Sequence, residues 1–217
     1  MLFDLDGVLV DSTPAVERVW RAWALEHGFD PGEAVQRAHG RPSLSTIRDY
    51  LPNADHEAEN REVERREIAD LAGVVAMPGA LDLLNALPPE AWAVVTSCTR
   101  SLAAARWGAA KLPQPRHWVT SNDIVHGKPA PDPYQLGAHR LGLDPRDCLV
   151  VEDAPAGIQA GKAAGARVLA VTTTAPEAVL RAAGATWIAP SVASLRLRQT
   201  HPELSLALAA STAPTAH

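Results

Sequence analysis

The sequence predicts an α/β protein in which a doubly wound parallel sheet carries an inserted all-helical segment. Short apolar runs recur along the chain, and Ala-rich helical stretches separate them. Parallel strands joined in this way need right-handed crossovers, which place helices on both faces of the sheet. One long interval without such a run predicts the insertion. We expect strands at residues 1–3, 92–95, 118–119, 148–151, 168–171 and 187–189.

The predicted insertion covers residues 12–78. Apolar side chains recur there with a helical period, as at Val16, Val19 and Trp23. The charged stretch at residues 57–70 is expected to form the solvated face of a helix, with opposite charges as neighbours, rather than a binding surface.

The remainder of the chain divides into a core and a tail. Pro78 and Gly79 together punctuate elements, so they mark the return from the insertion to the core. The core then comprises residues 1–11 and 79–200. Residues 201–217 form a C-terminal tail, whose weak Leu pattern predicts one further helical turn and to which we assign no function.

Composition excludes several classes of protein. With 217 residues, of which 47% are apolar and 21% charged, the chain can form one good-sized domain with an insertion. A net charge of −5 without a block of like charges argues against nucleic acid as a partner. Every apolar run is shorter than the roughly 18 to 20 residues of a membrane span, and Met1 leads directly into Phe3 and Asp4 rather than into a signal sequence. We therefore expect a cytoplasmic protein that does not bind a membrane, and we favour a monomer.

Cys98 and Cys148 are the only cysteines, and each lies beside an expected buried strand. Two cysteines placed in this way predict neither a disulfide framework nor a zinc site. We expect both to be reduced thiols without a catalytic role.

Two acidic pairs follow expected strands. Asp4 and Asp6 follow the first strand, and Glu152 and Asp153 follow the run at residues 148–151. Since open parallel sheets bind ligands at the carboxyl ends of their strands, these four carboxylates are expected to converge. Unpaired buried charge is costly, whereas Mg²⁺ prefers oxygen ligands, so the set predicts a magnesium site. Alone, the second pair is equally consistent with capping the helix that follows it.

Three further residues offer groups that bind phosphate. Lys128 lies in a loop after the expected strand at residues 118–119, where its ammonium can neutralise phosphoryl oxygens. Thr96 and Ser97 close another strand and offer a hydroxyl and backbone N–H groups near a helix start. Taken singly, each has a simpler explanation, the lysine as an exposed loop residue and the other two as an N-cap.

Four segments resemble, in order, the four motifs of the haloacid dehalogenase-like hydrolase superfamily. They are residues 4–12 (DLDGVLVDS), Thr96-Ser97, Lys128-Pro129 and residues 152–158 (EDAPAGI). The resemblance implies a Rossmann-like core, and the helical insertion looks like the cap of the β-phosphoglucomutase-like branch. Further similarity to the glycerol-1-phosphatase and 2-deoxyglucose-6-phosphatase group extends over residues 39–42, 84–88, 92–100, 127–134 and 157–165.

Carried over by position, this resemblance implies a phosphatase with a covalent intermediate. Asp4 would be the nucleophile that forms an aspartyl-phosphate, and Asp6 would be the general acid and then the general base. Mg²⁺ would be held by Asp4, the Asp6 carbonyl and Asp153, with Glu152 contributing directly or through water. The phosphoryl oxygens would be bound by the three predicted anion-binding residues, Lys128, Thr96 and Ser97.

The same resemblance assigns the selection of substrate to the cap. His39 and Arg41 from the insertion and Arg100 from the core are the candidate substrate contacts. In the resembled group the cap arginine often stands one position later, where this chain has Pro42, and Cys98 replaces a usual glycine.

The predicted activity is the Mg²⁺-dependent hydrolysis of a small sugar or polyol phosphate. The acid at position 6 disfavours dehalogenase-type and phosphonatase-type reactions, because neither protonates an alkoxide. A β-phosphoglucomutase-like phosphomutase and a phosphoglycolate-type phosphatase are the alternatives, since they would use the same core residues. A non-catalytic binding module is disfavoured because every chemical residue is present.

Overall fold

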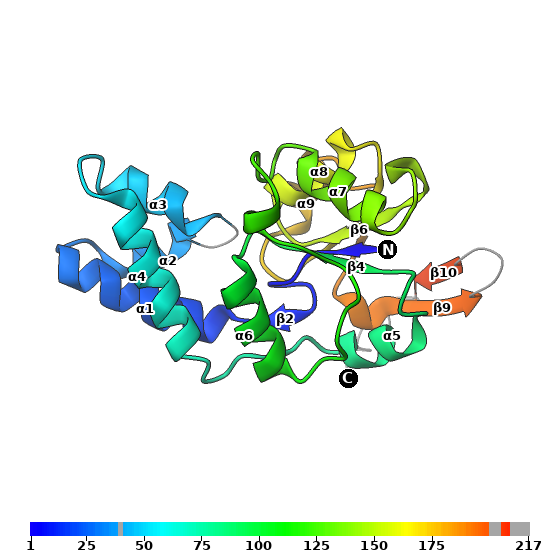
Figure 1. The fold of residues 1–217 in the computed structure, drawn as a ribbon, viewed down its shortest axis with the longest axis horizontal. Helices are drawn as coiled ribbons and strands as arrows, with labels where there is room; N and C mark the ends of the chain where they lie inside the picture. The colour runs from blue at the N-terminus through cyan, green and yellow to red at the C-terminus, as the bar shows by residue number, and fades with distance from the viewer. Residues whose placement is uncertain (39–40, 200–204, 209–217) are drawn as a thin grey trace, which may run out of the picture.

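The computed structural model describes residues 1–38, 41–199 and 205–208 of the chain. A parallel sheet forms the centre of the molecule (Figure 1). It has six strands in the order β5-β4-β1-β6-β7-β8. Every strand predicted for the core lies in this sheet, so the predicted fold class is confirmed. The strands are β1 (Leu2–Phe3), β4 (Ala93–Val95), β5 (Trp118–Val119), β6 (Leu149–Glu152), β7 (Arg167–Val171) and β8 (Trp187–Ala189).

Helices cover both faces of the sheet (Figure 1). Successive side chains of a strand point to opposite faces, so Phe3 packs into one apolar cluster and Leu2 into another. The Phe3 side is covered by α5 (Ala80–Ala86) and α6 (Arg100–Ala110), and the Leu2 side by α7 (Asp132–Arg140), α8 (Pro155–Ala163) and α9 (Glu177–Ala182). None of the described helices combines the length and apolar composition needed to cross a membrane. The connections also contain the 3-10 turns η1 (Ser121–Asp123), η2 (Pro145–Asp147) and η3 (Val192–Ser194).

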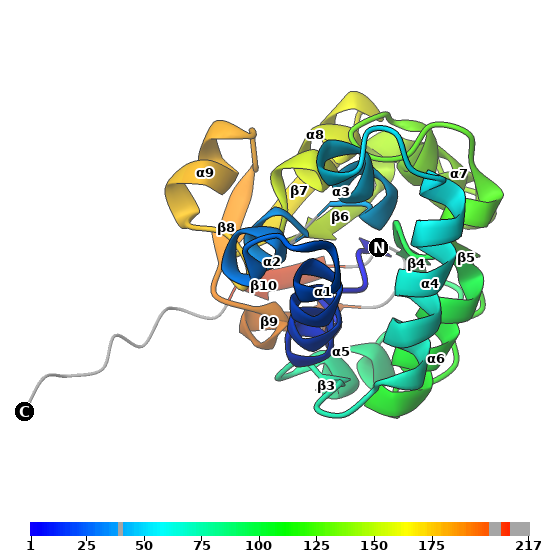
Figure 2. The ribbon, with the colours of Figure 1, turned by 90° about the vertical axis from the view of Figure 1, so that its left-hand side faces the viewer.

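The insertion forms a helical layer beside the core (Figures 1 and 2). It has an apolar cluster of its own, in which Trp20 and Trp23 are buried with their ring centroids 5.2 Å apart in an edge-to-face arrangement. These indoles bring much of the buried area that such a small layer needs. Its helices are α1 (Thr13–His27), α2 (Pro31–Ala38), α3 (Ser43–Tyr50) and α4 (His56–Ala69).

Two predictions about local structure are wrong. No strand was expected between residues 12 and 78, yet β3 (Val75–Ala76) pairs antiparallel with β2 (Val10–Asp11). This pair joins the two crossings between core and insertion. β3 lies in the apolar run at residues 74–77, which was overlooked because it stands inside the interval assigned to helices.

The second error concerns the C-terminal end. Instead of the predicted helical turn, β10 (Ser205–Leu208) pairs antiparallel with β9 (Leu195–Gln199). Leu195, Leu197 and Leu206 pack on the apolar cluster that contains Phe3. The leucines of this region therefore follow the period of a strand rather than that of a helix.

Candidate active site

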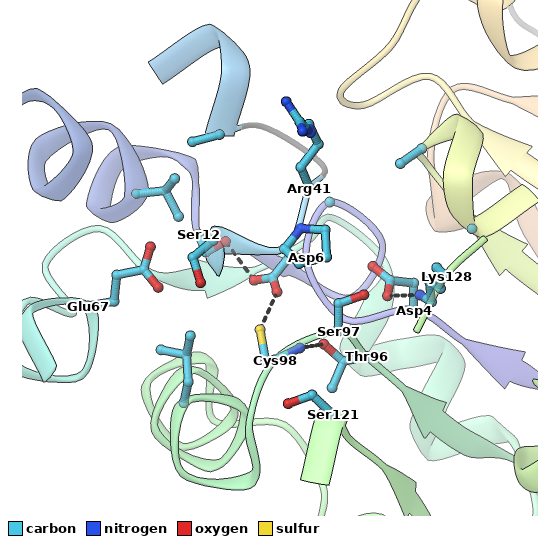
Figure 3. Close-up of a pocket in the computed structure, with 18 of the residues that line it drawn as sticks. Asp4, Asp6, Ser12, Arg41, Glu67, Thr96, Ser97, Cys98, Ser121 and Lys128 are labelled. Atoms are coloured by element: carbon cyan, nitrogen blue, oxygen red, sulfur yellow. Dashed lines mark hydrogen bonds and ion pairs between the residues drawn. The ribbon is translucent and has the colours of Figure 1, made fainter. Parts of the chain in front are cut away.

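A pocket lies between the carboxyl edge of the sheet and the insertion (Figure 3). The core lines it with the ends of β1, β4 and β6, and the insertion lines it with residues of α1, α3 and α4. The carboxyl ends of parallel strands meet at one edge, which explains why motifs far apart in the sequence reach the same pocket. Eight of the ten predicted site residues are among its lining residues, namely Asp4, Asp6, Arg41, Thr96, Ser97, Lys128, Glu152 and Asp153.

Asp4 occupies the centre of this edge. Its backbone N–H donates to the carbonyl of Val151 at 3.0 Å, and the strand before it pairs with both β4 and β6. The Asp4 carboxylate is buried and accepts a hydrogen bond from Lys128 Nζ at 2.5 Å. Burial raises the pKa of Asp4 to about 7; the attraction of Lys128 opposes this shift, while the charge of Glu152 adds to it.

Lys128 is not an exposed loop residue, because its side chain is only 7% exposed. Besides Asp4, its Nζ donates to Glu152 Oε1 at 2.7 Å and to the carbonyl of Val95 at 3.0 Å. Burial alone would lower the pKa of Lys128, but the charges of Asp4 and Glu152 outweigh that effect and raise it. The side chain is therefore a firmly held ammonium at the floor of the pocket.

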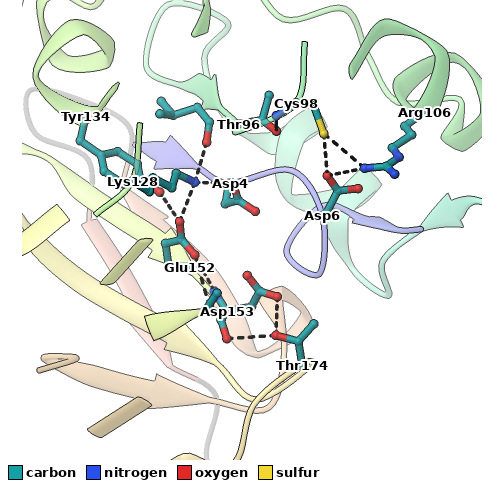
Figure 4. A network of polar contacts seen from close by, with 12 residues as sticks. Asp4, Asp6, Thr96, Cys98, Arg106, Lys128, Tyr134, Glu152, Asp153 and Thr174 are labelled. Carbon is teal, nitrogen blue, oxygen red and sulfur yellow. Dashed lines mark hydrogen bonds and ion pairs between the residues drawn. The ribbon is translucent and has the colours of Figure 1, made fainter. Parts of the chain in front are cut away.

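Glu152 holds this lysine in place. Its Oε1 also accepts a hydrogen bond from the Tyr134 hydroxyl at 2.6 Å, and its Oε2 accepts from the N–H groups of Asp153 and Ala154 at 3.0 and 3.3 Å (Figure 4). Position 157 must be glycine, because a Cβ there would overlap the Glu152 carboxylate. Both oxygens of Glu152 thus have partners on the protein.

Asp153 completes a buried acidic triad with Asp4 and Glu152, in which one oxygen of each lies within 4.8 Å of the others. Thr174 Oγ1 donates to Asp153 Oδ2 at 2.6 Å and fixes the carboxylate. Burial, followed by the charges of Glu152 and Asp4, raises the pKa of Asp153 well above its ordinary range. Clustered hard oxygen donors that repel one another are the set that a divalent cation stabilises, so these residues fit such an ion.

Asp6 does not join this triad with its carboxylate. Its Oδ1 accepts a hydrogen bond from Ser12 Oγ at 2.6 Å, and its Oδ2 lies 2.9 Å from Arg106 NH1 and 3.2 Å from Cys98 Sγ (Figure 4). Figure 3 shows Asp6 directed toward Ser12 and Cys98, whereas Asp4 lies beside Lys128. The prediction that four carboxylates converge therefore holds for three of them.

Thr96 and Ser97 lie at the carboxyl end of β4. Thr96 is buried, and its Oγ1 accepts a hydrogen bond from the Cys98 N–H at 3.1 Å. Ser97 is exposed to the pocket. The N-cap of α6 is Thr99, whose side chain accepts a hydrogen bond from the Leu102 N–H. Capping of α6 therefore does not explain Thr96 and Ser97.

The two candidate substrate contacts that the structure describes, Arg41 and Arg100, differ in their position relative to the pocket. Arg41 lines the pocket and pairs with Asp49 at 2.9 Å. Arg100 is exposed, pairs with Asp123 at 3.2 Å and is not among the lining residues. His39 lies outside the described residues.

The charged helix α4 differs in part from its prediction. Glu62 does form surface pairs with Arg65 and Arg66, as expected for a solvated face. Glu67, however, is buried, and Glu64 and Asn60 line the pocket. The error arose because one face of the helix presents charged residues to water and another presents them to the pocket, which the charge pattern alone does not distinguish.

Several residues of the site were not anticipated from the sequence. Tyr134 and Thr174 orient the acidic pair, and Arg106 contacts Asp6. Arg106 is the one that carried a signal, since a charged residue lies there among Ala and Trp on a helix that faces the core. Cys98 and Cys148 are free thiols, and Cys98 lines the pocket.

Comparison with known proteins agrees with this geometry. The family model of the haloacid dehalogenase-like hydrolases matches residues 1–165. The chain belongs to this family. A haloacid dehalogenase-like hydrolase of Deinococcus radiodurans, solved with bound phosphate and sodium, superposes with a TM-score of 0.66 at 29% identity, covering 88% of this chain and 90% of that one.

Two curated members of the family are phosphatases by name. Hexitol phosphatase A of Escherichia coli is 46% identical over 179 residues, covering 80% of this chain and 83% of its own length. Glycerol-1-phosphate phosphohydrolase 1 of Saccharomyces cerevisiae is 37% identical over 216 residues, covering 93% and 86%. The predicted family and the predicted class of enzyme, a phosphatase, are both confirmed.

Proposed function

We propose that this phosphatase is a Mg²⁺-dependent phosphomonoester hydrolase that acts on a small sugar or polyol phosphate through a phosphorylated Asp4. One observation carries the proposal. A buried carboxylate, Asp4, lies 2.5 Å from an equally buried ammonium, Lys128, beside two further acids at the floor of the pocket. A nucleophile, a counter-charge for phosphate and oxygen ligands for a cation are thus brought to one place.

The first half-reaction transfers the phosphoryl group to the enzyme. An Asp4 oxygen attacks phosphorus in line, and the bond from phosphorus to the ester oxygen breaks. Lys128, the Thr96 hydroxyl and the Ser97 N–H bind the phosphoryl oxygens, where the charge of the transition state is spread. Asp6 donates a proton to the departing alkoxide, which is a poor leaving group without it.

The second half-reaction restores the enzyme. Asp6, now a carboxylate, takes a proton from a water molecule that attacks phosphorus. The bond from phosphorus to Asp4 breaks, inorganic phosphate is released, and Asp6 again carries the proton that it needs for the next substrate. The insertion lines the side of the pocket that faces the sheet edge, and its closure over the substrate would limit the access of bulk water.

Two members of the acidic triad, Asp4 and Asp153, would hold the cation. Carboxylate oxygens of Asp4 and Asp153 and the Asp6 carbonyl are its proposed ligands, while Glu152, whose oxygens already have protein partners, supports it through Lys128 and through water. When bound, Mg²⁺ offsets the repulsion between the Asp4 carboxylate and the phosphate dianion. Mg²⁺ suits this site because it accepts one or two carboxylates together with phosphate and water.

Binding of the cation should be visible in thermal stability. Because the pKa of Asp4 is raised from 3.8 to about 7, the folded chain holds this proton more tightly than the unfolded chain, and stability falls as pH rises through that window. In EDTA we expect the Tm to be lower at about pH 8 than at about pH 5.5. Mg²⁺ at roughly 100 times its Kd should stabilise the fold by about 2.7 kcal/mol, or roughly 5–10 °C.

This gain should be larger at the higher pH, where the triad is ionised. The measurement is differential scanning fluorimetry with and without Mg²⁺ at both pH values. An Asp153→Asn variant should lose most of the gain, whereas an unchanged response in that variant would contradict the proposed ligand set.

The wall that the insertion contributes supports a substrate rich in hydroxyl groups. Asn60 and Glu64 line the pocket; the Asn60 carbonyl oxygen accepts a hydrogen bond from Ser43 Oγ at 2.5 Å, and Glu64 accepts one from Thr99 at 2.5 Å. Amide, hydroxyl and carboxylate groups bind sugar and polyol hydroxyls. The names of the two curated relatives point to the same class, a hexitol phosphate and a glycerol phosphate.

The same wall argues against a phosphomutase or a phosphoglycolate phosphatase. Both would place a second anionic group at the insertion side of the pocket. Among the lining residues described for the insertion, Arg41 is the sole cation, and it is paired with Asp49, while Glu64 and Glu67 are acidic. An anionic leaving group would meet like charge there.

The decisive experiment is a phosphate-release panel of sugar, polyol, glycolate and nucleotide monophosphates, with Mg²⁺ and with EDTA, repeated with Arg41→Ala. We expect release from polyol or sugar phosphates in Mg²⁺ and none in EDTA. A parallel incubation of a hexose 1-phosphate with trace bisphosphate tests the mutase. Formation of the isomer without free phosphate would overturn the proposal.

Asn60→Ala tests the polar wall. Loss of one hydrogen-bonding group costs about 1–1.4 kcal/mol, so we expect kcat/KM for the preferred polyol phosphate to fall roughly 5- to 10-fold. The kinetics of p-nitrophenyl phosphate, which has no hydroxyl groups to bind, should change little. Asn53→Ala, on an exposed loop of the same insertion, is the matched control. Equal effects of the two variants would show that Asn60 does not contribute to substrate binding.

A further inference from the structure

A buried arginine of the core contacts the side chain that delivers the proton. Arg106 belongs to α6, and its side chain is only 6% exposed. Its NH1 lies 2.9 Å from Asp6 Oδ2 and donates to Cys98 Sγ at 3.2 Å (Figure 4). Its NH2 lies 3.2 Å from Glu67 Oε2. The guanidinium therefore bridges two acids that lie in different parts of the chain.

This bridge is an expensive way to stabilise a fold. Taking charges out of water costs several kcal/mol per ion, and apolar side chains of similar volume often do better at such a position. Leu102, Ala103 and Trp107 fill the rest of the buried face of α6 with apolar groups. An arginine among these apolar groups is explained if a neighbouring group requires its positive charge.

Asp6 is that partner. Ser12 Oγ holds one of its oxygens at 2.6 Å, and Arg106 holds the other, so the planar carboxylate is fixed at both ends. Ser12 directly precedes α1, where the chain enters the insertion. The rotamer of Asp6 is thus set by one group of the core and one group at the entry to the insertion.

Glu67 adds a second link to the insertion. It lies in the last turn of α4, is itself buried, and occupies the other nitrogen of the guanidinium. An arginine presents its donors in a rigid planar fork, so a shift of α4 that displaces Glu67 also shifts the donor on Asp6. Asp6 and Glu67 share the Arg106 guanidinium, so the contact that Arg106 makes with one acid affects how tightly it holds the other acid.

We infer that Arg106 is a positioning residue for Asp6, and that Glu67 connects it to the insertion so that the proton donor is aligned together with closure of the pocket. This inference rests on the role proposed for Asp6. Arg106 then acts through the Asp6 carboxylate, which its NH1 contacts, rather than by binding the substrate itself.

The test compares two leaving groups. Glycerol 1-phosphate releases an alkoxide that needs a proton, whereas p-nitrophenyl phosphate releases a stable phenolate that does not. For Arg106→Met, we expect kcat for the alkyl phosphate to fall about 10²-fold and kcat for the aryl phosphate to change by no more than about 3-fold. Arg106→Lys, which keeps the charge but not the fork, should recover part of the loss.

A second variant separates positioning from folding. Arg106→Met alone leaves Glu67 buried without its cation, so it is expected to lower the Tm. The double variant Arg106→Met/Glu67→Met removes that unpaired charge and should regain thermal stability while keeping the difference between the two leaving groups. Glu62→Gln, which removes an acid from the solvated face of α4, is the control and should change kcat for neither substrate.

Equal losses on both substrates, or full recovery of the alkyl phosphatase activity in the double variant, would overturn the inference. A wild-type enzyme that hydrolyses neither substrate in Mg²⁺ would instead overturn the proposed function itself. The two failures are therefore distinguishable.

Discussion

Asp4→Asn is expected to lower kcat for phosphate release by on the order of 10⁴-fold or more, because loss of a covalent nucleophile removes the first half-reaction. Every substrate should be affected alike, including p-nitrophenyl phosphate, since the first half-reaction of each of them requires attack by Asp4, whatever its leaving group. Steady-state phosphate release over the substrate panel measures this directly.

The fold should survive this substitution. Asn has the volume of Asp, and Lys128 keeps Glu152 as its partner at 2.7 Å. Removing an ionised group whose pKa is raised by burial should leave the Tm unchanged or slightly higher near pH 8 in EDTA. Asp82→Asn, at an exposed position of α5, is the matched control. A variant of Asp4 that retains more than about a hundredth of wild-type kcat would contradict the nucleophile assignment.

Lys128→Met is expected to produce the second largest effect, and it should alter both activity and stability. Loss of the ammonium removes a donor to the phosphoryl oxygens, which is expected to lower kcat/KM roughly 10³-fold. It also leaves Asp4 and Glu152 buried without their shared cation, at a cost of roughly 3–5 kcal/mol. Chemical denaturation and steady-state kinetics measure the two effects.

Added Mg²⁺ separates the two effects. A divalent cation can compensate part of the negative charge, so we expect it to restore some stability to the Lys128→Met variant but little turnover. Lys162→Met, at an exposed position of α8, is the control for removal of a lysine. Normal turnover in the Lys128→Met variant would show that the lysine serves only to hold the acids together.

The core of the fold could be predicted because each buried strand leaves a continuous apolar run. The run at residues 148–151, for example, is covered on both faces, so its residues cannot alternate with polar ones. The pair formed by Val10–Asp11 and Val75–Ala76 is set instead by where the insertion leaves and rejoins the core. Such a contact depends on the tertiary structure, so the apolar run at residues 74–77 does not by itself identify the strand with which it pairs.

The floor of the site could be predicted for a related reason. Asp4, Thr96 and Glu152 follow strands whose carboxyl ends must meet, so topology alone brings them together. Arg106 and Glu67 come from helices, and the direction of a helical side chain depends on how the helix is rotated against its neighbours. That rotation is a property of packing, which is why the contact between these two residues appeared only in the structure.

The stereochemical course at phosphorus tests the central proposal, a covalent intermediate on Asp4, most directly. The substrate is a phosphorothioate ester made chiral with oxygen isotopes and hydrolysed in isotopically labelled water. Two successive in-line displacements, the first by Asp4 and the second by water, each invert the configuration. The proposed mechanism therefore predicts net retention, and net inversion would show that water attacks the substrate directly and would contradict it.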